Sequence, residues 1–314
     1  MSAAAPPVNG GFGSAAHVVV LGIDGIAVPE FLVELQGGRL PNFARIRANG
    51  RYSDHTRAVA PTWSKPNWAS ILYGADTSIH GVDSNDWRLD GPQAVPSIVG
   101  SAVPFPNLFS VLKAQEPDSA TASIYAWPGI STLTLPRECV DFDREFADQD
   151  RKTIDCAKAH LLSAKPRLTF IHLDDVDHAG HDHGSGSEYR AALRTTDQML
   201  GELLETIEAA GMKETTLLLI VSDHGRDSQG KDHGGWSLSE IETTWMAYGA
   251  MVPPAPTPET PLSTPVSLVD TSPTVLHALG LDQPLEWRGR PVLEVFGVKP
   301  KWVWAESAVR KQAA

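Results

Sequence analysis

The sequence has few cysteines, no long hydrophobic run and no excess of basic residues. Only Cys139 and Cys156 occur among its 314 residues. Whether they pair is left open, but two cysteines make no disulfide framework, and the pattern favours ordinary thiols in a reducing compartment. No apolar stretch reaches the roughly 18 residues of a membrane helix. We therefore expect no membrane-spanning segment.

Basic charge is scarce as well. The chain has 26 Lys and Arg against 38 Asp and Glu, a formal net charge of −12. This balance argues against binding to a nucleic-acid duplex, which requires a basic surface. It does not exclude a small anionic substrate, because bound metal ions can outweigh the overall charge of a protein at a local site.

The first 16 residues are rich in Ala, Pro, Gly and Ser. They lack the charged start and apolar core of a signal peptide. We expect residues 1–16 to form a disordered tail, residues 17–314 to form one domain, and the protein to be cytoplasmic. The sequence leaves the oligomeric state open.

Apolar runs alternate with helical patterns along the rest of the chain, which indicates an α/β fold with a parallel or mixed sheet. The segments 85–106 and 137–150 look irregular, and 178–187 looks like a His/Gly/Ser loop. Strands are expected at 17–23, 121–127, 167–173, 216–221 and 245–252, and helices at 29–38, 41–49, 66–74, 107–115, 153–164, 188–210 and 267–279.

Asp and His residues follow three of these apolar runs. The carboxyl ends of strands form the usual ligand-binding edge of an open α/β sheet. Six N/O ligands from distant segments are enough for two divalent metal ions. The candidates are Asp24, Asp177, His181, Asp223, His224 and His233.

The segment 174–183 offers two equivalent ligand pairs. Asp177 and His181 are four residues apart, so both can face one metal from the same side of a helix. Asp174 and His178 have the same spacing. The spacing does not choose between these pairs, and a solvated His-rich loop is the plainer alternative.

Ser64 is the candidate nucleophile, before a helix expected to begin near Pro66. A serine hydroxyl needs activation, which a helix N-terminus and a metal ion can both supply. The alternatives are that Ser64 only caps the helix and that Thr62 is the reactive hydroxyl. Lys65 either contacts a bound anion or is simply exposed.

These residues, in this order, resemble the alkaline phosphatase superfamily, and within it the type I phosphodiesterase/nucleotide pyrophosphatase family. The similarity extends from residue 17 to about residue 295. The matching motifs are Asp24-Gly25, Ser64-Lys65-Pro66-Asn67, His80-Gly81, Asn85, Asp177-His178-Ala179-Gly180-His181, Ser222-Asp223-His224-Gly225, His233-Gly234 and the segment 269–280.

The resemblance implies a three-layer α/β/α sandwich with a mostly parallel sheet, and an enzyme that acts on small phosphoesters. It implies one metal bound by Asp24, Asp223 and His224, and another bound by Asp177, His181 and His233. The ions are expected to be zinc, with manganese or iron as alternatives. Ser64 would attack phosphorus and form a phospho-enzyme. Asn85, the Ser64–Lys65 backbone N–H groups and the Lys65 side chain would contact the substrate.

Two features depart from the family. The nucleophile is a serine where this family mostly has threonine. Only eight residues separate His224 from His233, where relatives often insert a cap that selects substrates. Selection would then come from 85–106 and 128–150. The tryptophans at 63, 68, 87 and 236 are expected to form core or pocket wall, with stacking on a substrate as the alternative.

Overall fold

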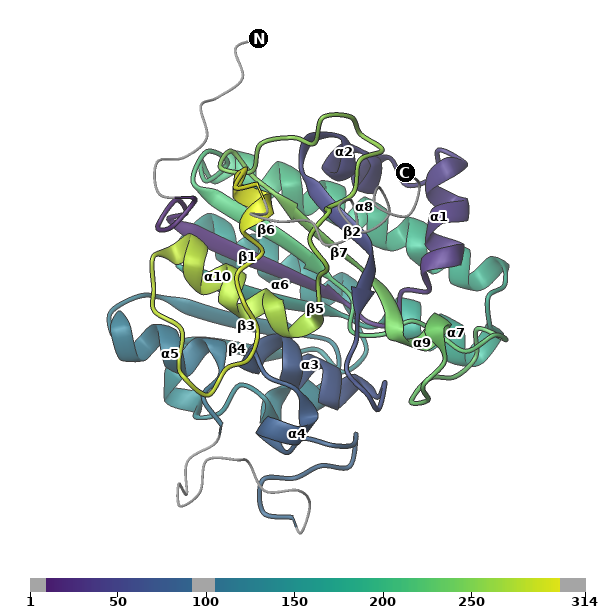
Figure 1. Ribbon diagram of the computed structural model, residues 1–314, viewed down its shortest axis with the longest axis horizontal. Helices are drawn as coiled ribbons and strands as arrows, with labels where there is room; N and C mark the ends of the chain where they lie inside the picture. The colour runs from purple at the N-terminus through teal and green to yellow at the C-terminus, as the bar shows by residue number, and fades with distance from the viewer. Residues whose placement is uncertain (1–9, 92–104, 300–314) are drawn as a thin grey trace, which may run out of the picture.

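A mostly parallel sheet runs through the centre of the molecule. The computed structural model describes residues 10–91 and 105–299. Within them, the strands lie in the order β2-β7-β6-β1-β5-β3-β4, as Figure 1 shows. The bounds are β1 His17–Ile23, β2 Arg51–Arg57, β3 Thr121–Tyr125, β4 Phe142–Glu145, β5 Leu168–Leu173, β6 Thr216–Val221 and β7 Glu242–Tyr248.

The three central strands explain the apolar runs. β1 pairs in parallel with β5 and with β6, and every residue of β5 and β6 is buried. A parallel strand covered on both faces must be apolar throughout. β7 is antiparallel to β6 and to β2, so the mixed sheet expected from the sequence is confirmed.

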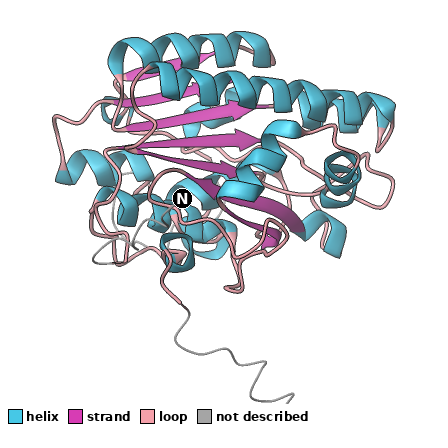
Figure 2. Ribbon diagram, turned by 90° about the horizontal axis from the view of Figure 1, so that it is seen from above, coloured by secondary structure: helices cyan, strands magenta, loops and turns pink. Residues whose placement is uncertain are grey.

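Helices cover both faces, as Figure 2 shows. Alternate residues of β1 divide between two cores. Val18 and Val20 belong to one core, together with residues of α3 (Ser64–Tyr73), α5 (Leu108–Gln115) and α10 (Thr271–Leu279). Val19 and Leu21 belong to the other core, together with residues of α1 (Val28–Gln36), α2 (Pro41–Asn49), α6 (Asp150–Ala164) and α8 (Ser187–Ala209). The predicted three-layer α/β/α architecture is therefore confirmed.

The helices largely match the expected ranges. Their bounds are α1 Val28–Gln36, α2 Pro41–Asn49, α3 Ser64–Tyr73, α4 Thr77–His80, α5 Leu108–Gln115, α6 Asp150–Ala164, α7 Asp175–His183, α8 Ser187–Ala209, α9 Leu238–Ile241 and α10 Thr271–Leu279. The apolar face predicted for the long helix α8 is buried. No helix in the described ranges is long and apolar enough to span a membrane.

Two expectations about local structure were wrong, and one strand was missed. The polar segment Arg51–Arg57, for which no element was expected, forms edge strand β2, and Phe142–Glu145, in the acidic segment expected to be irregular, forms β4. The segment expected to be a His/Gly/Ser loop is mainly helix α7. In each case pairing or packing with distant residues overrides a weak local pattern.

The predicted N-terminal tail also differs in part. Residues 1–9 lie outside the described residues, but residues 10–16 are tied to the domain. The backbone N–H groups of Gly13 and Ala15 donate to the carbonyls of His277 and Ala278 at 3.0 and 2.9 Å. Arg167 Nη1 donates to the carbonyl of Ala15 at 2.8 Å. The expectation of disorder is therefore wrong for residues 10–16.

Candidate active site

The carboxyl ends of β1, β5 and β6 bring the predicted residues together. Asp24 follows β1, and its N–H donates to the carbonyl of Leu173, the last residue of β5, at 2.9 Å. The N–H of Gly25 donates to Oδ1 of Asp223, just after β6, at 3.1 Å. Gly25 has φ +69°, and a Cβ there would collide with Asp177. The sharp turn expected after Asp24 therefore requires glycine.

Asp24, Asp223 and His224 form the first cluster, and all three are buried. His224 Nε2 lies 3.3 Å from Asp24 Oδ1 and 3.3 Å from Asp223 Oδ2. Neither carboxylate oxygen has a hydrogen-bond partner among the described residues. Two buried carboxylate oxygens that face the same point without a donor from the described residues form a place that a cation satisfies.

The electrostatics of this cluster lead to the same conclusion. Burial and the charge of Asp24 raise the pKa of Asp223 well above its usual value. Burial lowers the pKa of His224, but Asp223 and Asp24 outweigh it and raise that pKa to about 10. Both shifts favour a proton on the cluster when no metal is bound, because the buried negative charge of the carboxylates is otherwise uncompensated. The donor set fits a divalent ion, which would supply that positive charge.

Asp177, His181 and His233 form the second cluster. His181 Nε2 lies 3.1 Å from Asp177 Oδ2 and 3.1 Å from His233 Nε2. His233 Nε2 lies 3.9 Å from Asp177 Oδ1. The other ring nitrogen of His233 faces the carbonyl of Thr62 at 2.8 Å. A histidine that donates from Nδ1 to a carbonyl leaves Nε2 free to bind a metal.

The two clusters share one wall. The rings of His224 and His233 are stacked, with centroids 3.7 Å apart, and Asp177, His224 and His233 offer ligand atoms within 4.8 Å of one another. The structure thus gathers all six predicted ligands in one place. Two adjacent ions fit this arrangement better than two separate ones.

Ser64 begins α3 beside these clusters. Its Oγ lies 3.2 Å from His224 Nε2, and Trp63, not Ser64, occupies the N-cap position. Its hydroxyl makes no capping hydrogen bond. The rival hydroxyl of Thr62 donates to the carbonyl of Gly235 and accepts from the N–H of Gly234, both at 2.9 Å. Thr62 therefore holds the loop of His233, and Ser64 is the hydroxyl left for chemistry.

Asn85 and Lys65 are arranged differently from the expectation. The N–H of Lys65 donates to Oδ1 of Asn85 at 2.8 Å, so it is not free to bind a substrate oxygen. The Lys65 side chain is buried rather than exposed, and its Nζ donates to the carbonyl of Trp87 at 3.0 Å. Burial lowers the pKa of this ammonium group. Asn85 and Lys65 thus join the start of α3 to the segment 85–87.

Three residues that the sequence did not single out as site residues support Asp24 and Asp177. Trp68 Nε1 and His172 Nε2 lie 2.9 and 3.2 Å from Asp24 Oδ2, which leaves Oδ1 facing the first cluster. Arg226 is buried, and its Nη1 donates to Asp177 Oδ1. Trp68 was predicted only as core or pocket wall. Its position four residues after Ser64 was the one signal that it shares a helix face with the nucleophile.

The remaining tryptophans differ in exposure. Trp87 is buried, whereas Trp63 and Trp236 are 36% and 75% exposed. Trp63 packs edge-on against the ring of His233 at 5.4 Å. Trp63 therefore forms part of the wall of the site, as expected. Stacking of Trp236 on a substrate stays a prediction.

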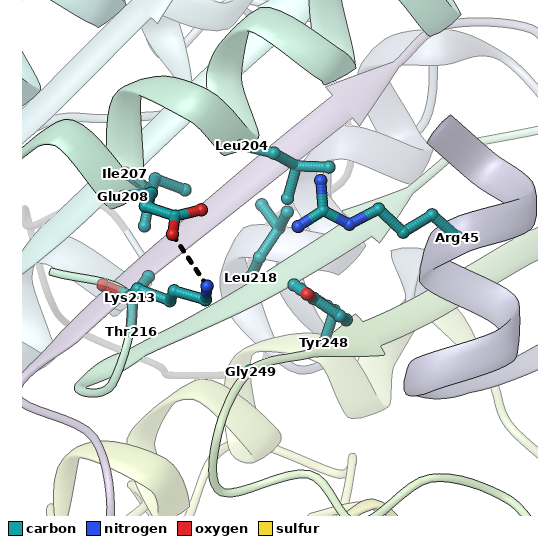
Figure 3. A pocket seen from close by; sticks show the side chains of 9 residues that line it. All are labelled: Arg45, Leu204, Ile207, Glu208, Lys213, Thr216, Leu218, Tyr248 and Gly249. Carbon is teal, nitrogen blue, oxygen red and sulfur yellow. Dashed lines mark hydrogen bonds and ion pairs between the residues drawn. The ribbon is translucent and has the colours of Figure 1, made fainter. Parts of the chain in front are cut away.

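A small pocket lies near Thr216, at the amino end of β6. Figure 3 shows it, with Lys213 Nζ paired with Glu208 Oε1 at 2.9 Å. None of the predicted site residues lines this pocket. The predicted ligands lie instead near the carboxyl ends of the central strands.

Comparisons with known proteins identify the family of the chain. The family model of type I phosphodiesterase/nucleotide pyrophosphatase matches residues 18–246. The ectonucleotide pyrophosphatase/phosphodiesterase family member 1 of Rattus norvegicus is 26% identical over 240 residues, covering 71% of this chain and 26% of that protein. The catalytic subunit of GPI ethanolamine phosphate transferase 3 of Mus musculus is 36% identical over 132 residues, covering 41% of this chain and 11% of that protein.

Solved structures share the fold. Murine ectonucleotide pyrophosphatase/phosphodiesterase 5, as an inactive variant with AMP, superposes with a TM-score of 0.68 at 14% identity, covering 89% of this chain and 99% of that one. A 2-O GAG sulfatase superposes with a TM-score of 0.74 at 13% identity, covering 92% and 76%. The chain spans about a quarter of the length of the ectonucleotide pyrophosphatase relatives that it matches in sequence. It belongs to the type I phosphodiesterase/nucleotide pyrophosphatase family.

Proposed function

We propose that this chain is a metal-dependent hydrolase of phosphodiester or nucleotide pyrophosphate bonds, with Ser64 as its nucleophile. The observation that carries the proposal is the position of Ser64 Oγ, at the N-terminus of α3 and 3.2 Å from His224 Nε2. The family model supports the reaction class.

The six ligands would hold two divalent ions. Asp24, Asp223 and His224 would bind the first, and Asp177, His181 and His233 the second. The mixture of carboxylates and imidazoles suits zinc, with manganese or iron as alternatives. When bound, such ions supply positive charge that stabilises the oxyanions of a phosphoester and lowers the pKa of a coordinated hydroxyl or water.

The residues of the chain then divide the reaction into two displacements. Ser64 Oγ gives its proton to solvent and forms a bond to phosphorus, while the bond from phosphorus to the leaving oxygen breaks and that oxygen departs as an anion or takes up a proton from solvent. Water next attacks the phospho-serine, releasing the product and restoring the hydroxyl. The N-terminus of α3 stabilises negative charge on the phosphoryl oxygens throughout.

Asn85 would donate from its side-chain amide to a substrate oxygen, because its Oδ1 already accepts from the N–H of Lys65. Lys65 would act indirectly, by positioning Asn85 rather than by contacting the substrate. Its ammonium holds the carbonyl of Trp87, which fixes the segment that carries Asn85. The remaining predicted selectivity segments lie partly outside the described residues, since 92–104 are not described. A cytoplasmic location stays a prediction from the sequence alone.

The test combines metal content with hydrolysis of bis-p-nitrophenyl phosphate by wild type and Ser64→Ala. We expect two ions per chain at the six ligands in both proteins, and a loss of hydrolysis of about 10³-fold or more in the variant. Thr62→Val is the matched control, because that hydroxyl holds a loop and should affect rate far less. Full activity of Ser64→Ala with metals bound would refute the proposal.

A phosphotransferase is the second candidate. It is favoured by the 36% identity to the GPI ethanolamine phosphate transferase subunit. The same phospho-serine would then pass its group to an alcohol instead of water. Addition of an acceptor alcohol that increases release of p-nitrophenol and yields a new phosphodiester would favour the transferase. Parallel rates on aryl phosphate monoesters, phosphonates and sulfates test the other reactions supported by this type of site, and turnover of none would indicate a non-catalytic binding protein.

A further inference from the structure

Helix α7 carries two Asp/His pairs, and the proposed two-metal centre uses only one of them. Asp177 and His181 face His233. Asp174, at the N-cap of α7, and His178 form the second pair, with Asp174 Oδ2 3.2 Å from His178 Nε2. This second pair faces a different part of the chain, the segment between β4 and α6.

Asp148 completes a cluster there. Ligand atoms of Asp148, Asp174 and His178 lie within 4.8 Å of one another. Asp148 is placed by its backbone, which has the left-handed φ of +59°, and its N–H donates to the carbonyl of Ala126 at 3.0 Å. A non-glycine residue held in this conformation is uncommon and is fixed by its surroundings.

Two other side chains nearby, those of Asp150 and His172, each already contact a partner. Both oxygens of Asp150 accept backbone N–H groups, from Asp174 at 2.8 Å and Asp175 at 3.0 Å. His172 Nε2 faces Asp24 Oδ2 at 3.2 Å. Asp150 therefore anchors the start of α7, and His172 supports the first metal cluster.

One buried atom points to a missing partner. Asp174 is only 3% exposed, yet its Oδ2 makes no hydrogen bond within the described part of the chain. Its contact with His178 is an ion pair without hydrogen-bond geometry. A buried carboxylate oxygen that accepts no hydrogen bond is costly, and the His178 imidazole offsets that cost only in its protonated form.

The side chains at this end of α7 carry an excess of negative charge. Four carboxylates converge on this end of α7, and the imidazoles beside them belong to His172 and His178. A divalent ion would offset the excess negative charge. The carboxylates are those of Asp148, Asp150, Asp174 and Asp175.

We propose that Asp148, Asp174 and His178 bind a further divalent metal ion beside the two-metal centre, since ligand atoms of Asp174 and Asp24 lie within 4.8 Å of each other. Two carboxylates and one imidazole suit an ion of the zinc or manganese class. Asp148 is exposed and the His178 side chain is 46% exposed, so water can fill the remaining coordination positions.

The decisive measurement is the difference in bound metal between wild type and His178→Ala. Both proteins are equilibrated with Zn²⁺ or Mn²⁺, freed of excess ion by gel filtration and measured by elemental analysis. We expect His178→Ala to bind one ion fewer per chain. Asp148→Asn, which changes a different segment, should lose the same ion. His183→Ala is the control, because it removes an exposed histidine from the same helix.

An equal metal content in wild type and His178→Ala would overturn the proposal. The total number of ions tests the proposed function separately. A wild-type value of two, unchanged in His178→Ala, leaves the two-metal centre intact and removes only the further site. A wild-type value of three that falls to two in both variants, with none lost in His183→Ala, supports the further site. A fall from two to one overturns it, because the two-metal centre accounts for both of those ions.

Discussion

The two halves of the proposed metal centre differ in burial and in charge. In the first half, Asp24, Asp223 and His224 are each at most 1% exposed. This half contains two carboxylates and one imidazole. In the second half, the His181 side chain is 39% exposed. This half contains one carboxylate and two imidazoles. Arg226 adds a further positive charge against Asp177. The first half therefore demands a cation, whereas the second half is already close to neutral without one.

The two halves differ in burial and charge because different elements build them at the same edge of the sheet. The first half lies just after the paired central strands β1 and β6. The elements packed around these strands bury its three side chains. The second half is built from α7 and from His233, which follows the short loop 225–232, and the His181 side chain reaches the surface. We expect the first ion to bind more tightly than the second, because buried charges are screened less by water.

The largest expected effect comes from neutralising one carboxylate in each half. Asp223→Asn should abolish binding of the first ion and slow hydrolysis by about 10³-fold, since the lost charge stabilisation is worth several kcal/mol. In the presence of a metal chelator, Asp223→Asn should raise the Tm, because it removes a buried carboxylate that is repelled by the charge of Asp24. Asp177→Asn should lower the Tm in chelator, because it leaves Arg226 buried without its partner, at a cost of about 3–5 kcal/mol.

Thermal melts with and without chelator check this contrast, alongside rates on bis-p-nitrophenyl phosphate. Shifts of the same sign in both metal-free variants would contradict the proposed difference between the halves. Asp227→Asn, in the same surface loop but outside both clusters, is the matched control.

A smaller effect is expected from Arg226→Met. Arg226 Nε and Nη2 donate to the carbonyls of Gly230 and Lys231 at 2.7 and 2.8 Å, and a Cβ at Gly180 would collide with the guanidinium. Arg226 thus joins Asp177 to the loop that leads to His233. The variant should weaken the second ion by about 10- to 100-fold, the usual effect of losing a group that orients a metal ligand.

Competition with a metal chelator measures both affinities. The first ion should be affected far less than the second, and Arg226→Lys should recover part of the loss. An equal loss at both halves would mean that Arg226 supports the fold generally rather than Asp177.

The smallest effect concerns the pH dependence of the metal-free protein. Asp223 and Asp24 outweigh burial and raise the pKa of His224 from 6.5 to about 10. This contribution to stability is fully present below pH 6.5 and is lost as the pH rises toward 10. Burial and the charge of His224 lower the pKa of His233 from 6.5 to about 4. That contribution is present above pH 6.5 and is lost as the pH falls toward 4.

The Tm in chelator should therefore be highest near pH 6.5 and fall by a few degrees on each side. His224→Asn should flatten the alkaline limb, and His233→Asn the acid limb. Measurement of the Tm between pH 4 and pH 10 decides this, and identical profiles for the two variants would contradict the opposite shifts.

Much of the fold was predictable because its signals are local. Buried parallel strands must be apolar throughout, so the core strands β1, β5 and β6 were visible as runs. The stripe of leucines in α8 repeats with the helical period. Strands β2 and β4 were missed because edge strands carry polar residues, and only their pairing with β7 and β3 shows them as strands.

The sequence by itself determined the set of Asp, His and Ser residues that meet at the carboxyl edge of the sheet, because strand ends and turns fix where those residues lie. Only the tertiary structure decided their partners. Spacing made Asp174/His178 and Asp177/His181 equivalent, and the segments packed against α7 distinguish them. Arg226 and His172 acquire their roles from contacts across 49 and 148 residues of sequence. Such contacts depend on how distant segments pack, which no local pattern records.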